Sequence, residues 1–313
     1  MITVFTRVLV IFAMIGVGFM ANKVGILPLE SKKYLTDLLL SISLPCMIIS
    51  SMLGKTLDGE TKKETQLVLI GSLAFFILAS IGALFALRLM KRTPVEDQGV
   101  LMVIMVAVNS GFMGFPISKA AFGDHIFFLM VMQNIVLNFY MFGIAAIQMH
   151  YRDAEKKAFL GSLKAVINPP VIAVIIGFAL MVAKVNLPSG VVDFVDMMGD
   201  ATIPLSMIVV GLQLAGSNFS KLLVNRDLIT SSLINVLAVP IITLTLIHFL
   251  PIPNTVKITL AFASAFPCAV AVVGVAIKEG KNSELMAGGV ALTTILSLFT
   301  LPVMAAILQW LYL

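Results

Sequence analysis

The chain has 313 residues, of which 59% are hydrophobic and only 12% are charged. Soluble domains carry about 45–50% apolar and about 25% charged residues, so this composition excludes a soluble enzyme, a disordered chain and a nucleic-acid-binding domain. The formal net charge of +5 comes from lysine and arginine residues that lie between long apolar runs. That arrangement is typical of a polytopic membrane protein.

Ten runs of about 20 mostly apolar residues follow one another, each long enough to cross a membrane as a helix. The runs cover residues 3–22, 34–53, 66–90, 98–122, 126–149, 169–187, 191–216, 228–250, 255–278 and 284–312. They do not alternate between polar and apolar residues, which excludes barrel strands. The first run lacks a small-x-small cleavage site, so it is predicted to be a membrane helix and not a signal peptide. We therefore expect an all-α polytopic membrane protein with ten transmembrane helices.

The distribution of lysine and arginine predicts the orientation of these helices. Fourteen of the 21 lie in the connections after odd-numbered runs, and seven lie on the other side. Because cytoplasmic loops carry the excess of Lys and Arg, the odd-numbered connections are predicted to be cytoplasmic. Both termini are then outside the cell, and the expected location is the plasma or inner membrane.

The most polar connection, residues 151–167, divides the chain into five runs and five runs. Because five is an odd number, two copies of one unit must insert with opposite orientation, as in many secondary transporters. The predicted domains are a first repeat over 1–150, a cytoplasmic connecting loop over 151–167 and a second repeat over 168–313. The halves also share a proline position, at Pro45 in the second run and Pro204 in the seventh.

Proline and glycine interrupt the fourth and ninth runs near their centres, in segments 109–116 and 264–269. A proline removes a backbone donor and clashes with the carbonyl four residues earlier, so the hydrogen-bond ladder opens. Open backbone inside a membrane must line a cavity or find protein partners. The exposed start of a half-helix carries free N–H groups and a partial positive charge, which suits an anion. The alternative is that these prolines only kink packed helices.

Amide side chains and one acid are the other polar groups within the runs. Asn134 and Asn138 are four residues apart and share a helix face, with Gln133 beside them. They either line a cavity that holds a carboxylate or attach this helix to its neighbours. Asp200 is a candidate for H⁺ or Na⁺ coupling, because acidic residues within membrane-spanning segments are rare and usually have a function. Its alternative place is the first turn of a helix that begins near Met197, where the dipole stabilises a carboxylate.

The sequence predicts neither a metal nor a cofactor. Cys46 and Cys268 have no metal-ligand spacing, and the three histidines are scattered along the chain. HExxH, paired carboxylates within the runs and a Ser/His set are all missing from the sequence, so we do not expect an enzyme.

Several segments, in order along nearly the whole chain, resemble the bacterial branch of the auxin efflux carrier family, related to the plant PIN-type carriers. They are Gly25-Ile26-Leu27-Pro28, Leu44-Pro45, Asn109 to Ile117, Asn168-Pro169-Pro170, Ile203-Pro204-Leu205 with Gly211, and Phe266-Pro267. The resemblance implies two inverted five-helix repeats in which the broken fourth and ninth helices cross. It also implies a scaffold of the first, second, sixth and seventh helices, often dimeric, and a transport domain made of the other six.

The resemblance also assigns residues. Asn109 falls on the crossover asparagine that contacts substrate in the plant carriers, and Pro267 falls on the crossover proline of the ninth helix. Val108 stands where the plant pattern has proline, and the third run has no counterpart of the plant acid–lysine pair. The bacterial branch instead implies malate, malonate or similar carboxylates. The predicted substrate-binding residues are Asn109, Ser110, Gly111, Gly114, Pro116, Gln133, Asn138, Ser264, Phe266, Pro267, Cys268 and Ala269.

We therefore expect a secondary transporter of small organic anions that works by elevator-type alternating access. Its substrates would be carboxylates such as malate or malonate, or auxin-like aromatic acids. The alternative is a sensor or scaffold that has the transporter fold but no net transport. The expected partners are the organic anion, the lipid bilayer, H⁺ or Na⁺ as coupling ion, and a second copy of the chain through the scaffold helices. Nucleic acid is not expected.

Overall fold

The computed structural model describes residues 2–90, 93–153, 167–217 and 224–313, with side chains from Thr6 onward. Within these ranges every regular element is a helix, and the only extended pairing is one antiparallel bridge between Val108 and Cys268. The prediction of an all-helical chain is therefore confirmed. Most of the predicted loop 151–167 lies outside the described residues.

The first half contains two long helices, two helices with an internal π turn, and one broken helix. In chain order its elements are α1 (Ile2–Lys23), α2 (Ser31–Leu38), η1 (Leu39–Ser43), α3 (Leu44–Ser50), α4 (Gly59–Leu89), α5 (Val95–Val106), α6 (Gly114–Phe122), α7 (Asp124–Phe139), η2 (Tyr140–Ile144) and α8 (Ala145–Met149). The second half follows with α9 (Pro169–Val182), α10 (Ser189–Asp200), α11 (Thr202–Ala215), α13 (Arg226–Leu233), η5 (Ile234–Ala238), α14 (Val239–His248), α15 (Asn254–Ser264), α16 (Ala271–Lys278) and α17 (Ser283–Tyr312).

Seven helices in the described part of the chain are long and apolar enough to cross a membrane, and α9 is a shorter apolar helix. The remaining two predicted runs, 98–122 and 255–278, are each split in two. Their pieces have 12 and 9 residues and 11 and 8 residues, all below the roughly 20 that a spanning helix needs. The multi-pass membrane character is confirmed.

Helix α4 begins earlier than hydropathy suggests, at Gly59 and not near residue 66. The Asp58 carboxylate accepts a hydrogen bond of 2.8 Å from the backbone N–H of Thr61 and so caps the first turn. The acidic Glu64 is buried within the helix, because His125 contacts it at 2.7 Å and the Thr255 hydroxyl donates to it. Hydrogen bonds with His125 on α7 and Thr255 on α15 thus offset the cost of burying the Glu64 carboxylate.

Two of the π turns precede a proline by two residues. Turn η1 ends at Ser43 before Pro45, and η5 ends at Ala238 before Pro240. A proline ring clashes with the carbonyl four residues earlier, and a wider turn makes room for it. These prolines therefore modify a continuous helix, whereas Pro116 and Pro267 accompany full interruptions.

Helix α1 packs closely against α11 through two glycines. A Cβ atom added at Gly18 would lie 2.3 Å from the carbonyl oxygen of Ile208, and one added at Gly211 would lie 2.2 Å from that of Ile15. Small residues of this kind let helix backbones approach in a membrane. Helix α3 packs in the same region against α9 and α10.

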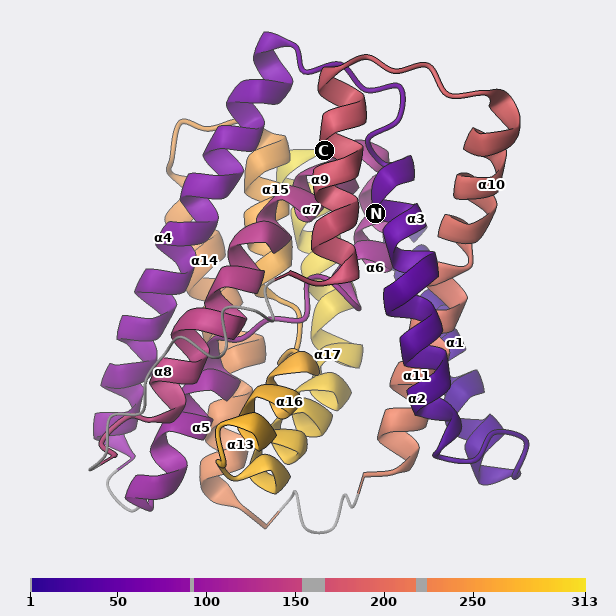
Figure 1. Cartoon of the computed structure of the whole chain (residues 1–313). Helices are drawn as coiled ribbons and strands as arrows, with labels where there is room; N and C mark the ends of the chain where they lie inside the picture. Colours follow the sequence, from indigo (N-terminus) through magenta and orange to yellow (C-terminus); the bar gives the residue numbers. More distant parts are fainter. Residues whose placement is uncertain (1, 91–92, 154–166, 218–223) are drawn as a thin grey trace.

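The other helices form a second group around α5 and α7, which are almost entirely buried. Figure 1 shows the connection 24–30 at the lower end of the molecule, and the connections 51–58 and 183–188 at the upper end. Both chain termini lie in the upper half of that view. The connection after the first predicted run therefore lies at the opposite end from those after the second and sixth runs.

Candidate functional site

The two broken helices meet through their non-helical segments, 107–113 and 265–270. The backbone N–H of Asn109 donates to the carbonyl of Pro267 at 2.8 Å, and the N–H of Ala269 donates to the carbonyl of Ala107 at 3.2 Å. These two bonds form the antiparallel bridge that places Val108 opposite Cys268. Each interruption therefore satisfies part of the backbone that the other leaves open.

Side chains from neighbouring helices satisfy more of this open backbone. Asn235 Nδ2 donates to the carbonyl of Met105, close to the end of α5, at 3.3 Å. Thr293 Oγ1 on α17 accepts a 3.0 Å hydrogen bond from the N–H of Cys268. Asn235 and Thr293 therefore stabilise the crossing, because a buried backbone group without a hydrogen-bond partner costs free energy.

A cavity of about 310 Å³ lies in front of the crossing, between it and helices α2, α7, α9 and α11. Its lining residues are Lys32, Thr36, Leu40, Leu44, Val108, Asn109, Gly111, Phe112, Asn134, Leu137, Asn138, Met141, Phe142, Asn168, Pro169, Pro170, Val209, Gln213, Ala269, Val270 and Ala271. Small-molecule sites typically enclose about 300–1,000 Å³ and combine apolar walls with a few polar groups. The cavity has both properties.

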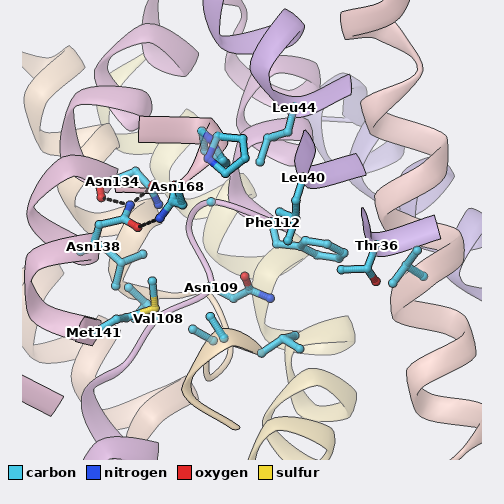
Figure 2. A pocket seen from close by; sticks show the side chains of 18 of the residues that line it. Thr36, Leu40, Leu44, Val108, Asn109, Phe112, Asn134, Asn138, Met141 and Asn168 are labelled. Carbon is cyan, nitrogen blue, oxygen red and sulfur yellow. Dashed lines mark hydrogen bonds between the residues drawn. The ribbon is translucent and has the colours of Figure 1, made fainter. Parts of the chain in front are cut away.

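The Asn109 side chain lines this cavity, and Figure 2 shows it between Asn138 on one side and Thr36 on the other. The residue is only 4% exposed, and its side-chain nitrogen Nδ2 has no hydrogen-bond partner among the described residues. A buried amide nitrogen without an acceptor costs free energy, which a ligand oxygen would recover. The crossing thus presents an unused donor to the cavity.

Backbone donors point to the same chemistry. Within the described part of the chain, the N–H groups of Gly111 and Phe112, before α6, and of Val270 and Ala271, at the start of α16, have no acceptor. All four residues line the cavity. Because the N-terminal end of a helix carries a partial positive charge, two such ends favour an anion between them.

Three asparagines form a hydrogen-bonded group on one side of the cavity (Figure 2). Asn138 Nδ2 donates to the backbone oxygen and to the Oδ1 of Asn134, at 2.8 and 2.9 Å. Asn168 Nδ2 donates to Asn138 Oδ1 at 3.2 Å, while Asn168 Oδ1 caps α9 through the N–H of Val171. Figure 2 shows Leu40, Phe112 and Thr36 on the opposite side of Asn109 from this group.

Four of the predicted site residues line the cavity, and the other eight are not part of its lining. The lining residues are Asn109, Gly111, Asn138 and Ala269. The residues outside the lining are Ser110, Gly114, Pro116, Gln133, Ser264, Phe266, Pro267 and Cys268. Ser110 Oγ donates to Gln133 Oε1 at 2.6 Å, and a Cβ added at Gly114 would lie 3.1 Å from the ring of Phe266, closer than an ordinary contact. The second set therefore shapes and supports the segments that carry the first.

Sequence reasoning missed the contribution of the opposite wall, above all Lys32, Thr36 and Gln213. From the sequence alone, Lys32 contributes only to the positive charge of the connection after the first run. A usable signal existed, because Lys32, Thr36 and Leu40 recur at intervals of four residues, the spacing of one helix face. Asn168 stands out in the sequence only as part of the segment Asn168-Pro169-Pro170, which resembles the auxin efflux carrier family.

Asp200 lies outside the cavity lining and its side chain is 69% exposed. Its carboxylate forms an ion pair of 3.1 Å with Lys119 of α6. The alternative that placed Asp200 in the first turn of a helix is wrong, because α10 begins at Ser189 and Asp200 is its last residue. A coupling role for Asp200 stays a prediction.

Two further polar clusters lie at opposite ends of the second helix group. Glu64, His125 and Thr255 form one of them. The other contains His150, which contacts Asp153 at 2.6 Å and Glu279 at 3.1 Å, while Lys281 donates to Asp153. Hydrogen bonds from Lys281 and His150 hold the pKa of Asp153 below its usual value. In the described part of the chain, no three His, Cys, Asp or Glu side chains are grouped to hold a metal ion.

Comparison with known proteins gives one family. The family described as "Membrane transport protein" matches residues 3–305. A protein of Methanothermobacter thermautotrophicus, described as an uncharacterized transporter, is 21% identical over 304 residues, which cover 96% of this chain and 97% of the relative. An uncharacterized transporter of Methanocaldococcus jannaschii is 24% identical over 311 residues, with the same coverage of 96% and 97%.

Proposed function

The chain belongs to the membrane transport protein family, the auxin efflux carrier family that its motifs resemble, and on this premise we propose that it is a secondary transporter of small organic anions. The cavity in front of the crossing is the proposed binding site. The single observation that carries this proposal is the buried, unpartnered Nδ2 of Asn109 beside the starts of two half-helices. Neutral donors and helix dipoles are suited to bind a carboxylate without a fixed counter-ion.

The proposed architecture has ten transmembrane helices in two inverted repeats. The first repeat would comprise α1, α2–η1–α3, α4, α5–α6 and α7–η2–α8; the second would comprise α9, α10–α11, α13–η5–α14, α15–α16 and α17. Its support is that the fourth member of each half is broken and that the two breaks pair with each other. Inverted repeats bring such discontinuous helices together at the midplane.

In this proposal the cavity faces the cytoplasm in the conformation described here. Its far wall comes from the start of α2, the start of α9 and the end of α11, which adjoin connections predicted to be cytoplasmic. At the other end, Lys119 on α6 pairs with Asp200, and Arg7 on α1 donates to the carbonyl of Ala120. These contacts join the broken helix α5–α6 to the scaffold on the outer side.

Transport would proceed by movement of one rigid body against another. Helices α4 to α8 and α13 to α17 would move together, because a site made of both broken helices must not be divided during transport. Helices α1 to α3 and α9 to α11 would form the fixed scaffold, and two scaffolds would associate as a homodimer in the bilayer. The connections on either side of the scaffold helices would serve as hinges. We expect these hinges in segments 54–65 and 216–227, which join scaffold helices to moving helices. Because α4 begins at Gly59, the non-helical part of the first is shorter than that segment, and residues 218–223 of the second lie outside the described residues.

Uptake and counterflow in proteoliposomes test the proposed activity. A panel of mono- and dicarboxylates, including malate, malonate and an indole acid, would be run with and without Na⁺ and pH gradients. We expect saturable counterflow of at least one carboxylate. Binding of a carboxylate without uptake or counterflow would favour the sensor or scaffold alternative, and neither binding nor transport across the panel would refute the proposal.

Distance measurements between spin labels test the mechanism. Labels on α6 and α16 should keep a constant separation while both move relative to α3 or α11. Separation of α6 from α16, with α6 held at constant distance from α3, would contradict rigid-body movement. Cysteine labelling at Lys156, which lies outside the described residues, and at Leu313 tests the topology, and labelling of both from one side would contradict it.

A further inference from the structure

Among the described residues that line the cavity, Lys32 alone has an ionisable side chain. It is the second residue of α2 and is partly buried, and within the described part of the chain it has no hydrogen-bond or ion-pair partner. Its neighbour Lys33 is exposed and does not line the cavity. In the described lining, one positive charge therefore faces the site and no acid neutralises it.

The helix geometry explains why Lys32 and not Lys33 reaches the cavity. Lys32, Thr36, Leu40 and Leu44 recur at intervals of four and all line it. In a regular α-helix this row would drift around the axis, because four residues exceed one turn of 3.6. The π turn η1 contains Leu40 and has more residues per turn, which offsets part of the drift. One face of the α2–η1–α3 segment thus forms a wall of the cavity.

The lysine and the neutral donors belong to opposite sides of the site. Asn109 and the backbone donors come from the crossing, whereas Lys32 lies one helical turn, about 6 Å along the axis, beyond Thr36 on the opposing wall. In Figure 2, Thr36 lies on the other side of Asn109 from the asparagine group. A ligand that spans the cavity would meet amide donors at one end and an ammonium group at the other.

We propose that Lys32 is a specificity-determining residue that pairs with the second negative charge of a dianionic substrate, whose first carboxylate binds the donors of the crossing. The inference rests on the proposed function. A lysine ammonium attracts a carboxylate more strongly in a partly apolar cavity than in water, so a dianion gains affinity that a monoanion of the same shape does not. Since Lys32 belongs to the scaffold and Asn109 to the moving body, this pairing would hold the dianion only in the conformation described here.

The experiment measures binding of matched ligand pairs by calorimetry. The protein would be placed in nanodiscs of zwitterionic phosphatidylcholine and titrated with malonate, malate and succinate, each compared with its monoamide. The monoamide keeps the size of the diacid and removes one charge. The variants are Lys32→Gln, Lys32→Arg and, as a matched control one residue away, Lys33→Gln, and thermal unfolding in each case reports whether the variant is folded.

The expected result is a loss of charge discrimination. For at least one diacid, Lys32→Gln should bind about 10-fold or more weakly, since a hydrogen bond to a charged group is typically worth that much. Its affinity for the monoamide should change less than about 3-fold. Lys32→Arg should keep most of the preference for the diacid, and Lys33→Gln should bind both ligands like the wild type.

Several outcomes would overturn the inference. Lys32→Gln could keep the wild-type preference for the diacid, or lose affinity equally for both ligands, which would indicate a structural role. Adding phosphatidylglycerol to the nanodiscs could displace a diacid from the wild type but not from Lys32→Gln, which would make Lys32 a lipid-headgroup contact. A wild type that binds monocarboxylates but prefers no diacid refutes this inference alone, whereas a wild type that neither binds nor transports any carboxylate refutes the proposed function as well.

Discussion

The two interruptions have the same architecture and opposite chemistry. Segment 107–113 carries Asn109 and Ser110, whereas segment 265–270 is apolar apart from its backbone and the thiol of Cys268. The first segment gives the cavity a side-chain donor and backbone donors; the second gives it backbone alone. Both breaks supply free N–H groups and space. The side chains therefore decide which break contacts a ligand through a side chain and which one contributes backbone alone.

The apolar break is also the more tightly packed of the two. Phe266 packs edge-on against Phe262, with ring centroids 4.9 Å apart, and approaches Gly114 closely. The N–H of Cys268 has its acceptor in Thr293 of α17. In contrast, Asn109 Nδ2 has none. Both breaks offer backbone donors to the cavity, but within the described residues only the first offers an unpaired side-chain donor as well.

The largest effect should come from removing the Asn109 donor. Asn109→Ala is expected to weaken binding of an anionic substrate about 10- to 150-fold, because a hydrogen bond to a charged group is worth ~1.5–3 kcal/mol. Thermal unfolding should change little, since Nδ2 has no partner to lose. Calorimetry measures the affinity. The matched control is Asn254→Ala, at the outer end of the second broken helix. Unchanged binding in well-folded Asn109→Ala would contradict the proposal that the first break binds the ligand through Asn109.

Loss of a contact to the apolar break, segment 265–270, should instead lower the free energy of unfolding. Thr293→Val keeps the side-chain shape but leaves the buried N–H of Cys268 without an acceptor, so we expect a loss of about 1–3 kcal/mol in the free energy of unfolding. Thr294→Val is the control. Its hydroxyl bonds only to the carbonyl of Val290 within its own helix, and its loss should cost less. Equal destabilisation by both substitutions would show that the Cys268 contact has no special weight.

Glycine substitutions compare the space available at the two breaks. A Cβ at Gly111 would lie 2.8 Å from Asn134 Nδ2, so Gly111→Ala should displace Asn134 and weaken anion binding by several-fold. A Cβ at Gly274 of α16 meets nothing within 4 Å, so Gly274→Ala should leave binding unchanged and stabilise the helix by about 0.4–1 kcal/mol. Calorimetry and thermal unfolding give the two readings. Tighter binding in Gly111→Ala would contradict the packing seen here.

The smallest effect concerns the polar cluster that follows α16. The pKa of Asp153 is lowered by hydrogen bonds from Lys281 and His150, so its stabilising contribution is present above its unfolded pKa and is lost as the pH falls through the lower, folded pKa. Asp153→Asn should therefore lower the melting temperature slightly at pH 7. The difference from the wild type should shrink as the pH falls below about 4, near the unfolded pKa, and disappear below the lower, folded pKa. A difference that grows as the pH falls would contradict this assignment.

The sequence located both interruptions but could not assign them different roles. Proline and glycine at 111–116 and at Pro267 act locally on the backbone, so their effect is readable from residue type alone. Which freed groups find partners depends on contacts from distant helices, such as Asn235 to Met105 and Thr293 to Cys268. Those contacts join residues 25 and 130 positions apart in the chain, and no local pattern encodes them.

Length, composition and apolar runs by themselves determined that this is an all-helical membrane protein, because a bilayer accepts few backbone structures and demands long apolar segments. The tertiary structure alone decided that Asn109, Gly111, Asn138 and Ala269 face the cavity while Gln133 and Cys268 are not part of its lining. It also decided that Lys32 faces them across that cavity. The physical reason is that helix spacing fixes which residues share a face, whereas the packing of one helix on another decides what that face meets.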